Sequence, residues 1–275
     1  MTVETVLVTG ASSGIGLHLA HRFAAEGHPL FLVAPEETEL DEVAWTIQQR
    51  HAVEVTPIAA DLEDRDSFEA ISHALSGRTV DILVNNAGHG FRGNYADVPL
   101  ATHLSMLRLN VEAVLRMTSL ILPAMVARGS GRLLNTASIA GFEPGPTMSV
   151  YHASKAFVLS WSEAIATELE GSGVTVTALC PGPTDTDFFP KGDIGESVAF
   201  QKGHLMDPEE VADEGYRALM KGERIVVPGA VNKALVFSRR FMSEHAQSKL
   251  NQKMYEDVDT HRRDRGDKES TPGTR

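Results

Sequence analysis

Short runs of Val, Ile and Leu alternate along the chain with longer segments in which apolar residues recur every three or four positions. The runs are typical of buried parallel strands, and the longer segments are typical of the helices that cover them. We expect about seven strands, at residues 3–9, 30–34, 53–59, 82–85, 132–137, 174–180 and 225–227. We expect helices near residues 14–26, 37–50, 64–76, 100–128, 150–170 and 208–221. The pattern therefore predicts an α/β fold with one parallel sheet and helices on both faces.

The order of the elements predicts a doubly wound sheet. Right-handed crossovers place the first three strands in one half and the next three in the other, with ligands beyond the carboxyl ends of the strands. Residues 1–229 form this domain, and an extension over 230–255 carries one amphipathic helix at 231–254. For residues 256–275, a tail of mixed charge, we expect disorder.

Charge and cysteine content narrow the classes of function. Lys and Arg number 25 against 37 Asp and Glu, a formal net charge of -12, which disfavours general attraction to nucleic acid or to anionic membranes. Cys180 is the one cysteine, so no internal disulfide forms, and no spacing resembles a metal site. The amino-terminal residues lack the features of a signal peptide, and no apolar run approaches the roughly 20 residues that cross a bilayer. We expect a soluble, cytoplasmic protein without a metal.

A glycine-rich turn follows the first predicted strand directly. Residues 9–16 read Thr-Gly-Ala-Ser-Ser-Gly-Ile-Gly and lead into a helix. Glycines let the backbone turn sharply beside a phosphate, and the amino end of a helix offers N–H donors and partial positive charge. Glycines also serve plain strand-to-helix turns, but the position after the first strand of a doubly wound sheet favours a dinucleotide site. A nucleoside-triphosphate loop is excluded, because no Gly-Lys-Ser/Thr follows.

The spacing Thr-Gly-x-x-x-Gly-x-Gly resembles the short-chain dehydrogenase/reductase family. The resemblance covers roughly residues 3–228 and continues through Asn85-Asn86-Ala87-Gly88, Asn110, Ser138, Tyr151-x-x-x-Lys155 and Pro181-Gly182. It implies a Rossmann-like fold, a lid at about 183–207, and NAD(H) or NADP(H) as cofactor. The cofactor-binding residues that it implies are Gly10, Ser12, Ser13, Gly14, Ile15, Gly16, Asp61, Leu62, Asn86, Ala87, Gly88, Tyr151, Lys155, Pro181, Gly182, Thr184 and Thr186.

Tyr151 and Lys155 lie four residues apart at the start of a predicted helix, so they share one face about 5–6 Å apart at Cβ. An ammonium there favours the phenolate, whereas burial raises the Tyr pKa. Moving that pKa from about 10 toward 7 takes roughly 4 kcal/mol. The resemblance implies that Tyr151 transfers a proton and that Lys155 tunes it and binds the nicotinamide ribose. It implies that Ser138 hydrogen-bonds the substrate oxygen and that Asn110 holds a water in the proton relay.

The end of the second strand leaves the choice between the two cofactors open. In the family, an acidic residue there favours NAD and a following Arg favours NADP, but this chain has Ala34 and Pro35. Glu36 and Glu37 follow, and a carboxylate about 6 Å from a phosphate charge costs roughly 3 kcal/mol at an effective dielectric of 20. These carboxylates also suit a helix start that faces solvent. After the third strand, Asp61 suits either an adenine contact or a helix cap.

The substrate side is predicted to be apolar. The residues that indicate this are Phe91, Phe142, Met148, Phe188, Phe189, Phe200, Leu205 and Met206. Several of them could equally pack the lid onto the domain. His89, His152 and His204 could reach the pocket but suit ordinary loop or helix positions. The apolar residues Leu235, Val236, Phe237 and Phe241 could cover the site or close an oligomer, and the acidic balance disfavours a membrane contact.

The function that we expect is a homodimeric or homotetrameric NAD(P)-dependent oxidoreductase that interconverts a small apolar carbonyl compound and its alcohol. The resemblance implies pairing through the helices at 100–128 and 152–170. One alternative is an epimerase or dehydratase of the extended relatives, which carry a larger substrate domain. The other is a binding protein that senses a nicotinamide cofactor. Composition does not name the substrate or the direction of the reaction.

Overall fold

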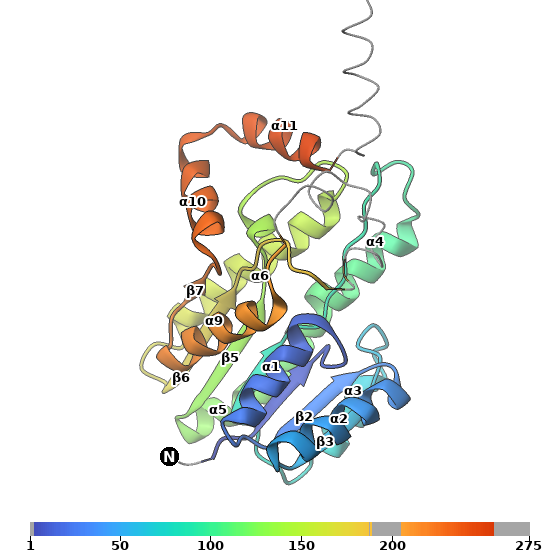
Figure 1. The fold of residues 1–275 in the computed structure, drawn as a ribbon, viewed down its shortest axis with the longest axis vertical. Helices are drawn as coiled ribbons and strands as arrows, with labels where there is room; N and C mark the ends of the chain where they lie inside the picture. The colour runs from blue at the N-terminus through green and yellow to red at the C-terminus, as the bar shows by residue number, and fades with distance from the viewer. Residues whose placement is uncertain (1–2, 187, 189–204, 256–275) are drawn as a thin grey trace, which may run out of the picture.

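The computed structural model describes residues 3–186, 188 and 205–255. In this part of the chain one parallel sheet has the strand order β3-β2-β1-β4-β5-β6-β7. The strands are β1 (Val6–Thr9), β2 (Leu30–Ala34), β3 (Val55–Ala59), β4 (Ile82–Asn85), β5 (Gly131–Thr136), β6 (Val174–Leu179) and β7 (Ile225–Val226). Val6 of β1 pairs with Leu30 on one side and Ile82 on the other, so the strand order reverses there. The predicted doubly wound fold is confirmed (Figure 1).

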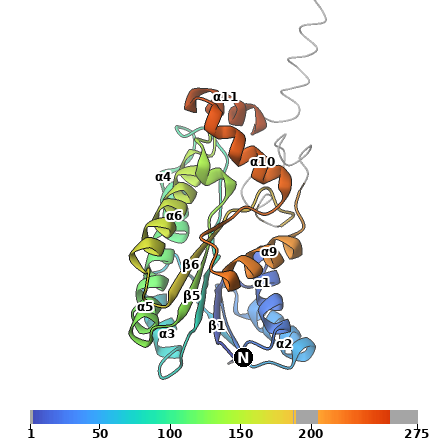
Figure 2. The same cartoon turned by 90° about the vertical axis from the view of Figure 1, so that its left-hand side faces the viewer.

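Helices cover both faces of the sheet, which gives the three layers in Figure 2. On one face lie α1 (Gly14–Ala25), α2 (Glu37–His51) and α9 (Pro208–Lys221). On the other face lie α3 (Ser67–Ala74), α5 (Ala113–Arg128) and α6 (Ser149–Glu168), with α4 (Leu100–Leu107) leading into α5. Beyond the carboxyl ends of the strands lie α10 (Ala230–Ser238) and α11 (Glu244–Met254).

Alternate residues of each strand point to opposite faces of the sheet, and helices bury both faces from solvent. Val6 and Val8 of β1 pack with the α1 and α2 side, whereas Leu7 packs with the α3 and α5 side. All four residues of β1 are buried. This double burial explains why the strands are continuous apolar runs rather than alternating ones.

Several predicted element ends shift by a few residues. The first strand begins at Val6 rather than residue 3, and the helix expected at 64–76 spans Ser67–Ala74. The Thr5 amide donates to the Asp81 side chain rather than to a neighbouring strand, and Asp64, Arg65 and Asp66 form bends and a turn ahead of α3. The positions of the elements agree with the prediction even where their ends differ.

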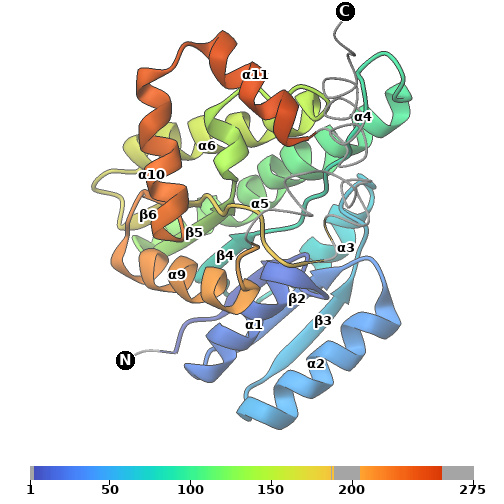
Figure 3. The same cartoon turned by 45° about the horizontal axis from the view of Figure 1, so that its top comes forward.

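The single helix predicted over residues 231–254 is wrong. A 3-10 turn at Arg239–Phe241 follows α10, and Met242 is extended, with φ of -109° and ψ of 141°. Ser243 then caps α11, because its Oγ accepts a hydrogen bond from the Ala246 amide at 3.3 Å. Figure 3 shows the two helices set at an angle over the end of α6.

One helix runs from Leu100 to Arg128, through α4, a π-helical turn at Arg108–Glu112, and α5. By length and composition alone it could cross a membrane, with a mean hydropathy of 1.4, so the expectation that no segment reaches this length does not hold. In the structure 39% of its most apolar window is buried, and Met117 and Met125 pack against the sheet. Its packing is that of a core helix.

Candidate active site

A cavity of about 450 Å³ lies where the sequence predicts a ligand, beyond the carboxyl ends of the strands. Its walls come from the turn after β1, the segment after β4, the ends of β5 and β6, and the start of α6. The extension that holds α10 and Tyr255 forms a further wall. Most of the predicted cofactor residues line it, namely Gly10, Ser12, Ser13, Gly14, Ile15, Asn86, Ala87, Gly88, Tyr151, Lys155, Pro181, Gly182, Thr184 and Thr186.

The glycine turn fits the phosphates of a dinucleotide. Gly10 has a positive φ of 63°, which favours glycine, and a Cβ on Gly16 would lie 2.1 Å from the Gly10 carbonyl oxygen. Gly16 therefore lies under the cavity and lets the turn close tightly on itself. Ser13 is the extended N-cap of α1 and makes no capping hydrogen bond with its side chain. The amino end of α1 can thus offer its N–H groups to an anion in the cavity.

Thr9 and Asn86 hold this turn against the segment that follows β4. The Thr9 Oγ1 accepts hydrogen bonds from the amides of Asn86 at 3.0 Å and Ala87 at 3.1 Å. The Asn86 Nδ2 donates to the Thr9 and Gly10 carbonyls, and its Oδ1 accepts from Thr136. Asn86 therefore shapes the cavity as a brace between strands, while Thr9 is a member of this brace that motif reasoning missed.

Asp61 and Leu62 do not line the described cavity. The Asp61 Oδ1 accepts a hydrogen bond from the Glu63 amide at 2.9 Å and so forms a turn. The helix cap that the sequence offered as an alternative is wrong, because α3 begins at Ser67 and its N-cap is Asp66. Leu62 is 6% exposed and packs in the core beside Ile71. At the adenosine end predicted for the cavity, Ala34 and Pro35 line the wall.

Ser138 stands at the end of β5 and caps the 3-10 turn Ile139–Phe142. Its Oγ accepts from the Ala140 amide at 3.1 Å and donates to the Pro181 carbonyl at 3.4 Å. It also lies beside the Tyr151 hydroxyl and lowers the pKa of Tyr151. Ser138 thus caps the 3-10 turn with the same hydroxyl that is expected to bind the substrate, and the cap fixes this hydroxyl beside Tyr151.

Tyr151 and Lys155 lie one turn apart on α6, as predicted, and both are buried. The Lys155 Nζ lies 5.9 Å from the centre of the Tyr151 ring and donates to the Thr136 carbonyl at 2.8 Å. Burial raises the pKa of Tyr151 to about 12, against a smaller lowering by Ser138. Burial lowers the pKa of Lys155 to about 8. In the protein alone, desolvation outweighs the expected effect of the ammonium, so Tyr151 holds its proton at neutral pH.

Asn110 lies in the π-helical turn Arg108–Glu112, where the regular α-helix is interrupted. Its Nδ2 donates to the His89 carbonyl at 2.8 Å and to Ser154 Oγ at 3.1 Å, and its Oδ1 accepts from the His89 amide at 3.0 Å. A Cβ on Gly88 would lie 3.0 Å from that oxygen and 3.4 Å from the Lys155 Nζ. The side chain therefore fixes the segment after β4 beside Lys155. The resemblance implied that Asn110 holds a water, and the structure shows its side chain bonded directly to the main chain of His89.

Several cavity residues escaped the sequence prediction because they belong to the extension. Val231, Asn232, Arg239, Met254 and Tyr255 all line the cavity, as does Leu235, which the sequence did suggest. Asn232 packs so closely on Gly182 that a Cβ there would lie 2.5 Å from its Nδ2. No local motif marks these positions, since they meet the site only through tertiary packing.

Of the apolar residues predicted for the substrate side, Met148 and Phe188 line the cavity, whereas Phe91, Phe142, Leu205 and Met206 pack in apolar clusters outside its lining. The Phe188 ring lies 5.3 Å from the Tyr151 ring, and Met148 packs in the same cluster. His89 lines the cavity, and its Nε2 lies 2.9 Å from Ser105 Oγ. The predicted Phe189, Phe200 and His204, and most of the lid, lie outside the described residues.

A doubly wound sheet with a glycine turn, and with Ser, Tyr and Lys side chains grouped at its carboxyl edge, is the arrangement of a Rossmann-type dinucleotide-binding protein. The model of the short chain dehydrogenase family matches residues 4–194. This chain belongs to the short-chain dehydrogenase family.

Individual relatives agree with this assignment. The ketoacyl reductase HetN of a Nostoc species is 34% identical over 184 residues, and the match covers 66% of this chain and 64% of that protein. A Sphingobium yanoikuyae short-chain dehydrogenase, solved with NADPH, is 32% identical with a TM-score of 0.78, covering 87% and 94% of the two chains. The bulky-bulky ketone specific alcohol dehydrogenase of Comamonas testosteroni is 29% identical with a TM-score of 0.75, covering 88% and 93%.

Proposed function

We propose that this protein is a nicotinamide-dependent oxidoreductase that interconverts an apolar ketone and its secondary alcohol. The observation that carries the proposal is the Tyr151 hydroxyl, beside Ser138 and followed one turn later by Lys155, in the same cavity as the glycine turn. The intact set of side chains supports an enzyme over a protein that only senses the cofactor. Epimerases and dehydratases of the extended type carry a larger substrate domain, whereas the described part of this chain has two short helices, α10 and α11, after the sheet.

Each of the three side chains has a task that follows from its position. The hydroxyls of Ser138 and Tyr151 hold the substrate oxygen, and Tyr151 transfers the proton to it or from it. The buried Lys155 ammonium supplies positive charge beside Tyr151 and faces the place of the nicotinamide ribose. When bound, the nicotinamide supplies or accepts the hydride at the substrate carbon.

The protonation state of the site favours reduction of the ketone. Because burial raises the pKa of Tyr151 to about 12, its hydroxyl is ready to give a proton at neutral pH. Oxidation of the alcohol needs the phenolate instead, which this desolvated position disfavours.

Apolar side chains surround the place where the substrate would lie. Ala140, Met148, Phe188, Leu235 and Tyr255 line the cavity near Tyr151. This lining suits a ketone with two carbon arms rather than a sugar, whose hydroxyls need hydrogen-bond partners. The names of the two similar reductases, a ketoacyl reductase and an alcohol dehydrogenase for bulky ketones, support the same class.

The described lining suggests which form of the cofactor the site accepts. Beside Ala34 and Pro35 it holds no cation to pair with a 2′-phosphate, since its two cationic side chains are Lys155 and Arg239. Lys155 lies beside Tyr151, and Arg239 is paired with Glu143. This charge pattern supports NAD(H), whereas the NADPH in the Sphingobium relative supports NADP(H). Titration of the purified protein with NADH and with NADPH, read by fluorescence at matched ionic strength, decides between them.

Assembly and location complete the proposal. Leu104 and Leu107 on α4 and Phe157 on α6 are 39–43% exposed, and we propose that a second copy of the chain covers them in the cytoplasm. Light scattering after size exclusion should give at least twice the chain mass of 29.8 kDa. A monomer at assay concentration would remove this part of the proposal.

The test of the activity is oxidation of NADH or NADPH by a panel of aryl ketones, with the alcohol identified by mass spectrometry. We expect steady turnover that needs both cofactor and ketone. Tight cofactor binding with no turnover of any carbonyl compound would favour the cofactor-sensing alternative instead.

A further inference from the structure

We infer that the extension over residues 230–255 is the substrate-side wall of the cavity and that Tyr255 sets the size of the substrate that fits beside Tyr151. This inference rests on the proposed function, because it assigns the specificity of the same site. It adds a residue that lies beyond the part of the chain matched by the family model, which ends at residue 194.

A buried ion pair fixes the middle of the extension to the active-site loop. Arg239 and Glu143 approach to 2.5 Å, and their side chains are only 7% and 5% exposed. Arg239 also donates to the Ile139 carbonyl at 2.9 Å, next to Ser138. Its own carbonyl accepts a hydrogen bond from Gln247 of α11. Arg239 therefore joins the loop after β5 to both parts of the extension, because its guanidinium binds the loop and its carbonyl binds α11.

A second attachment lies at the end of α11. The Asn251 Nδ2 donates to the Pro144 carbonyl at 2.9 Å. The Tyr255 hydroxyl lies 3.2 Å from His152 Nε2, while His152 Nδ1 lies 2.9 Å from the Glu143 carbonyl. Since a carbonyl only accepts, Nδ1 carries the proton, and Nε2 of the neutral ring accepts from Tyr255. His152, the residue that follows the catalytic Tyr151, thus connects the Tyr255 hydroxyl to the Glu143 main chain.

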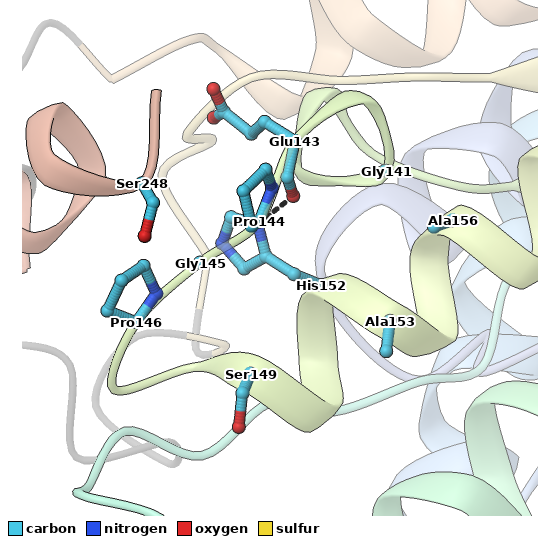
Figure 4. Close-up of a pocket in the computed structure, with 10 residues that line it drawn as sticks. All are labelled: Gly141, Glu143, Pro144, Gly145, Pro146, Ser149, His152, Ala153, Ala156 and Ser248. Carbon is cyan, nitrogen blue, oxygen red and sulfur yellow. Dashed lines mark hydrogen bonds between the residues drawn. The ribbon is translucent and has the colours of Figure 1, made fainter. Parts of the chain in front are cut away.

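Figure 4 shows the outer side of this connection. His152 points to the main chain of Glu143, and Ser248 of α11 faces Pro146 across a second cavity of about 480 Å³. The extension does not pack tightly on the loop here. Arg239, Asn251 and Tyr255, which do not line this second cavity, hold the extension on the loop by their polar contacts.

The ring of Tyr255 faces the reacting end of the cavity. It packs in one apolar cluster with Met148, Tyr151 and Phe188, and it lines the cavity. Its carbonyl accepts a hydrogen bond from Arg92 at 3.1 Å, and its ring lies 5.6 Å from that of His152, edge to face. Because the Tyr255 carbonyl is bonded to Arg92 and its hydroxyl to His152, the ring is a fixed part of the cavity wall. A substrate arm that extends from Tyr151 toward Tyr255 would contact this ring.

The same extension provides a matched control. Phe241 is 78% exposed and does not line the cavity. Tyr255→Ala and Phe241→Ala remove similar aromatic rings from one segment, but only the first opens the substrate side. Tyr255→Phe keeps the ring and loses the hydroxyl, and Tyr255→Trp enlarges the ring.

The first experiment compares kcat/KM for acetophenone and benzophenone in these four variants and the wild type, with the preferred cofactor. Tyr255→Ala should raise the ratio of benzophenone to acetophenone about tenfold, and Tyr255→Trp should lower it. The change should lie mainly in KM, with the cofactor Kd unchanged. A purely structural role of Tyr255 would move both variants in the same direction. An unchanged ratio in both, or an equal change in Phe241→Ala, would overturn the inference.

The second experiment does not need turnover. The naphthyl ketone Prodan reports its own binding by fluorescence, and Tyr255→Ala should tighten its binding about fivefold while Phe241→Ala and Tyr255→Phe leave it within about twofold. The inference is contradicted if Phe241→Ala changes the Prodan affinity and Tyr255→Ala does not, or if neither substitution changes it. If no ketone is reduced but Tyr255→Ala still tightens the binding of Prodan, the proposed activity fails and the assignment of Tyr255 to the cavity wall stands. Should Tyr255→Ala not bind cofactor because it does not fold, Tyr255→Trp decides in both experiments.

Discussion

The two ends of the cavity are built in different ways. The cofactor side is made of main chain in positions that only glycine tolerates, with Gly10 and Gly16 in a single run of eight residues. The substrate side is made of side chains that meet across long distances in sequence, such as His152 and Tyr255, which are 103 residues apart. A backbone cradle fits a constant ligand, whereas a wall of side chains can change without disturbing it. The difference separates binding of the cofactor from choice of the substrate.

Tyr151→Phe should have the largest effect, because it removes the proton that the reaction needs. We expect kcat to fall about 10³-fold, with the cofactor Kd within about twofold of wild type. Steady-state kinetics and a fluorescence titration on the same preparation check both numbers. Comparable turnover in a folded Tyr151→Phe protein would contradict the role given to the hydroxyl.

Gly16→Ala should break the cofactor side. The new Cβ would lie 2.1 Å from the Gly10 carbonyl oxygen, so the turn must open. We expect the cofactor Kd to rise about 100-fold, measured by titration. The matched control is Gly215→Ala in α9, where the nearest atom belongs to the flexible side chain of Leu179. The same loss in Gly215→Ala would show general misfolding instead.

Arg239→Met should break the substrate side. It leaves Glu143 buried without its cation, which costs about 3–5 kcal/mol. Hydrogen exchange should therefore rise in residues 244–255, and the double variant Glu143→Leu, Arg239→Met should recover most of the protection. Arg240→Met, at an exposed neighbouring position, is the control. Protection of α11 that stays unchanged in Arg239→Met would mean that the ion pair does not hold the extension.

Pro35→Arg should alter the cofactor side without breaking it. An Arg here can pair with a 2′-phosphate, so we expect the ratio of Kd for NADH over NADPH to rise about tenfold. Paired titrations of variant and wild type measure that ratio. An unchanged ratio would mean that residue 35 does not face the adenosine ribose.

The smallest expected effect is on pH dependence at the substrate side. Burial lowers the pKa of His152, which faces Tyr151, Tyr255, Glu143 and the cation Arg239. When the extension leaves the loop, His152 becomes exposed and its pKa returns toward the ordinary value of about 6.5, so it binds a proton more readily than in the docked state. Docking is therefore complete above that pH and weakens as the pH falls further. Hydrogen exchange of α11 at pH 5.5 and 7.5 should show this change, and His152→Asn should reduce it. Equal slopes in both proteins would contradict it.

The same contrast explains how much the sequence could predict. The sheet and the glycine turn followed from contiguous signals, namely apolar runs buried on both faces and a short motif at a strand end. The Tyr151–Lys155 pair followed from helical spacing, but the direction of the Tyr151 pKa did not, because burial is a property of the folded cavity. The turn that Asp61 forms with the Glu63 amide was not among the two roles that the sequence offered, an adenine contact and a helix cap, because α3 begins only at Ser67.

The extension was the least predictable part. Helical periodicity continued through residues 242–243, and the helix-start signal of Ser243 followed by Glu244 competed with it. The sequence assigned no role in the site to Arg239 or Tyr255, because their partners Glu143 and His152 lie about 100 residues earlier. Only the tertiary structure brings these side chains to the cavity.

The central claim is that hydride moves between a nicotinamide and a carbonyl carbon in this cavity. The most direct measurement uses cofactor deuterated at the transferable C4 position, an aryl ketone, and mass spectrometry of the product. The account predicts an alcohol with deuterium on its carbinol carbon in wild type, and almost none in Tyr151→Phe at equal cofactor occupancy. A cofactor-saturated protein that yields no labelled alcohol from any ketone in the panel would contradict it.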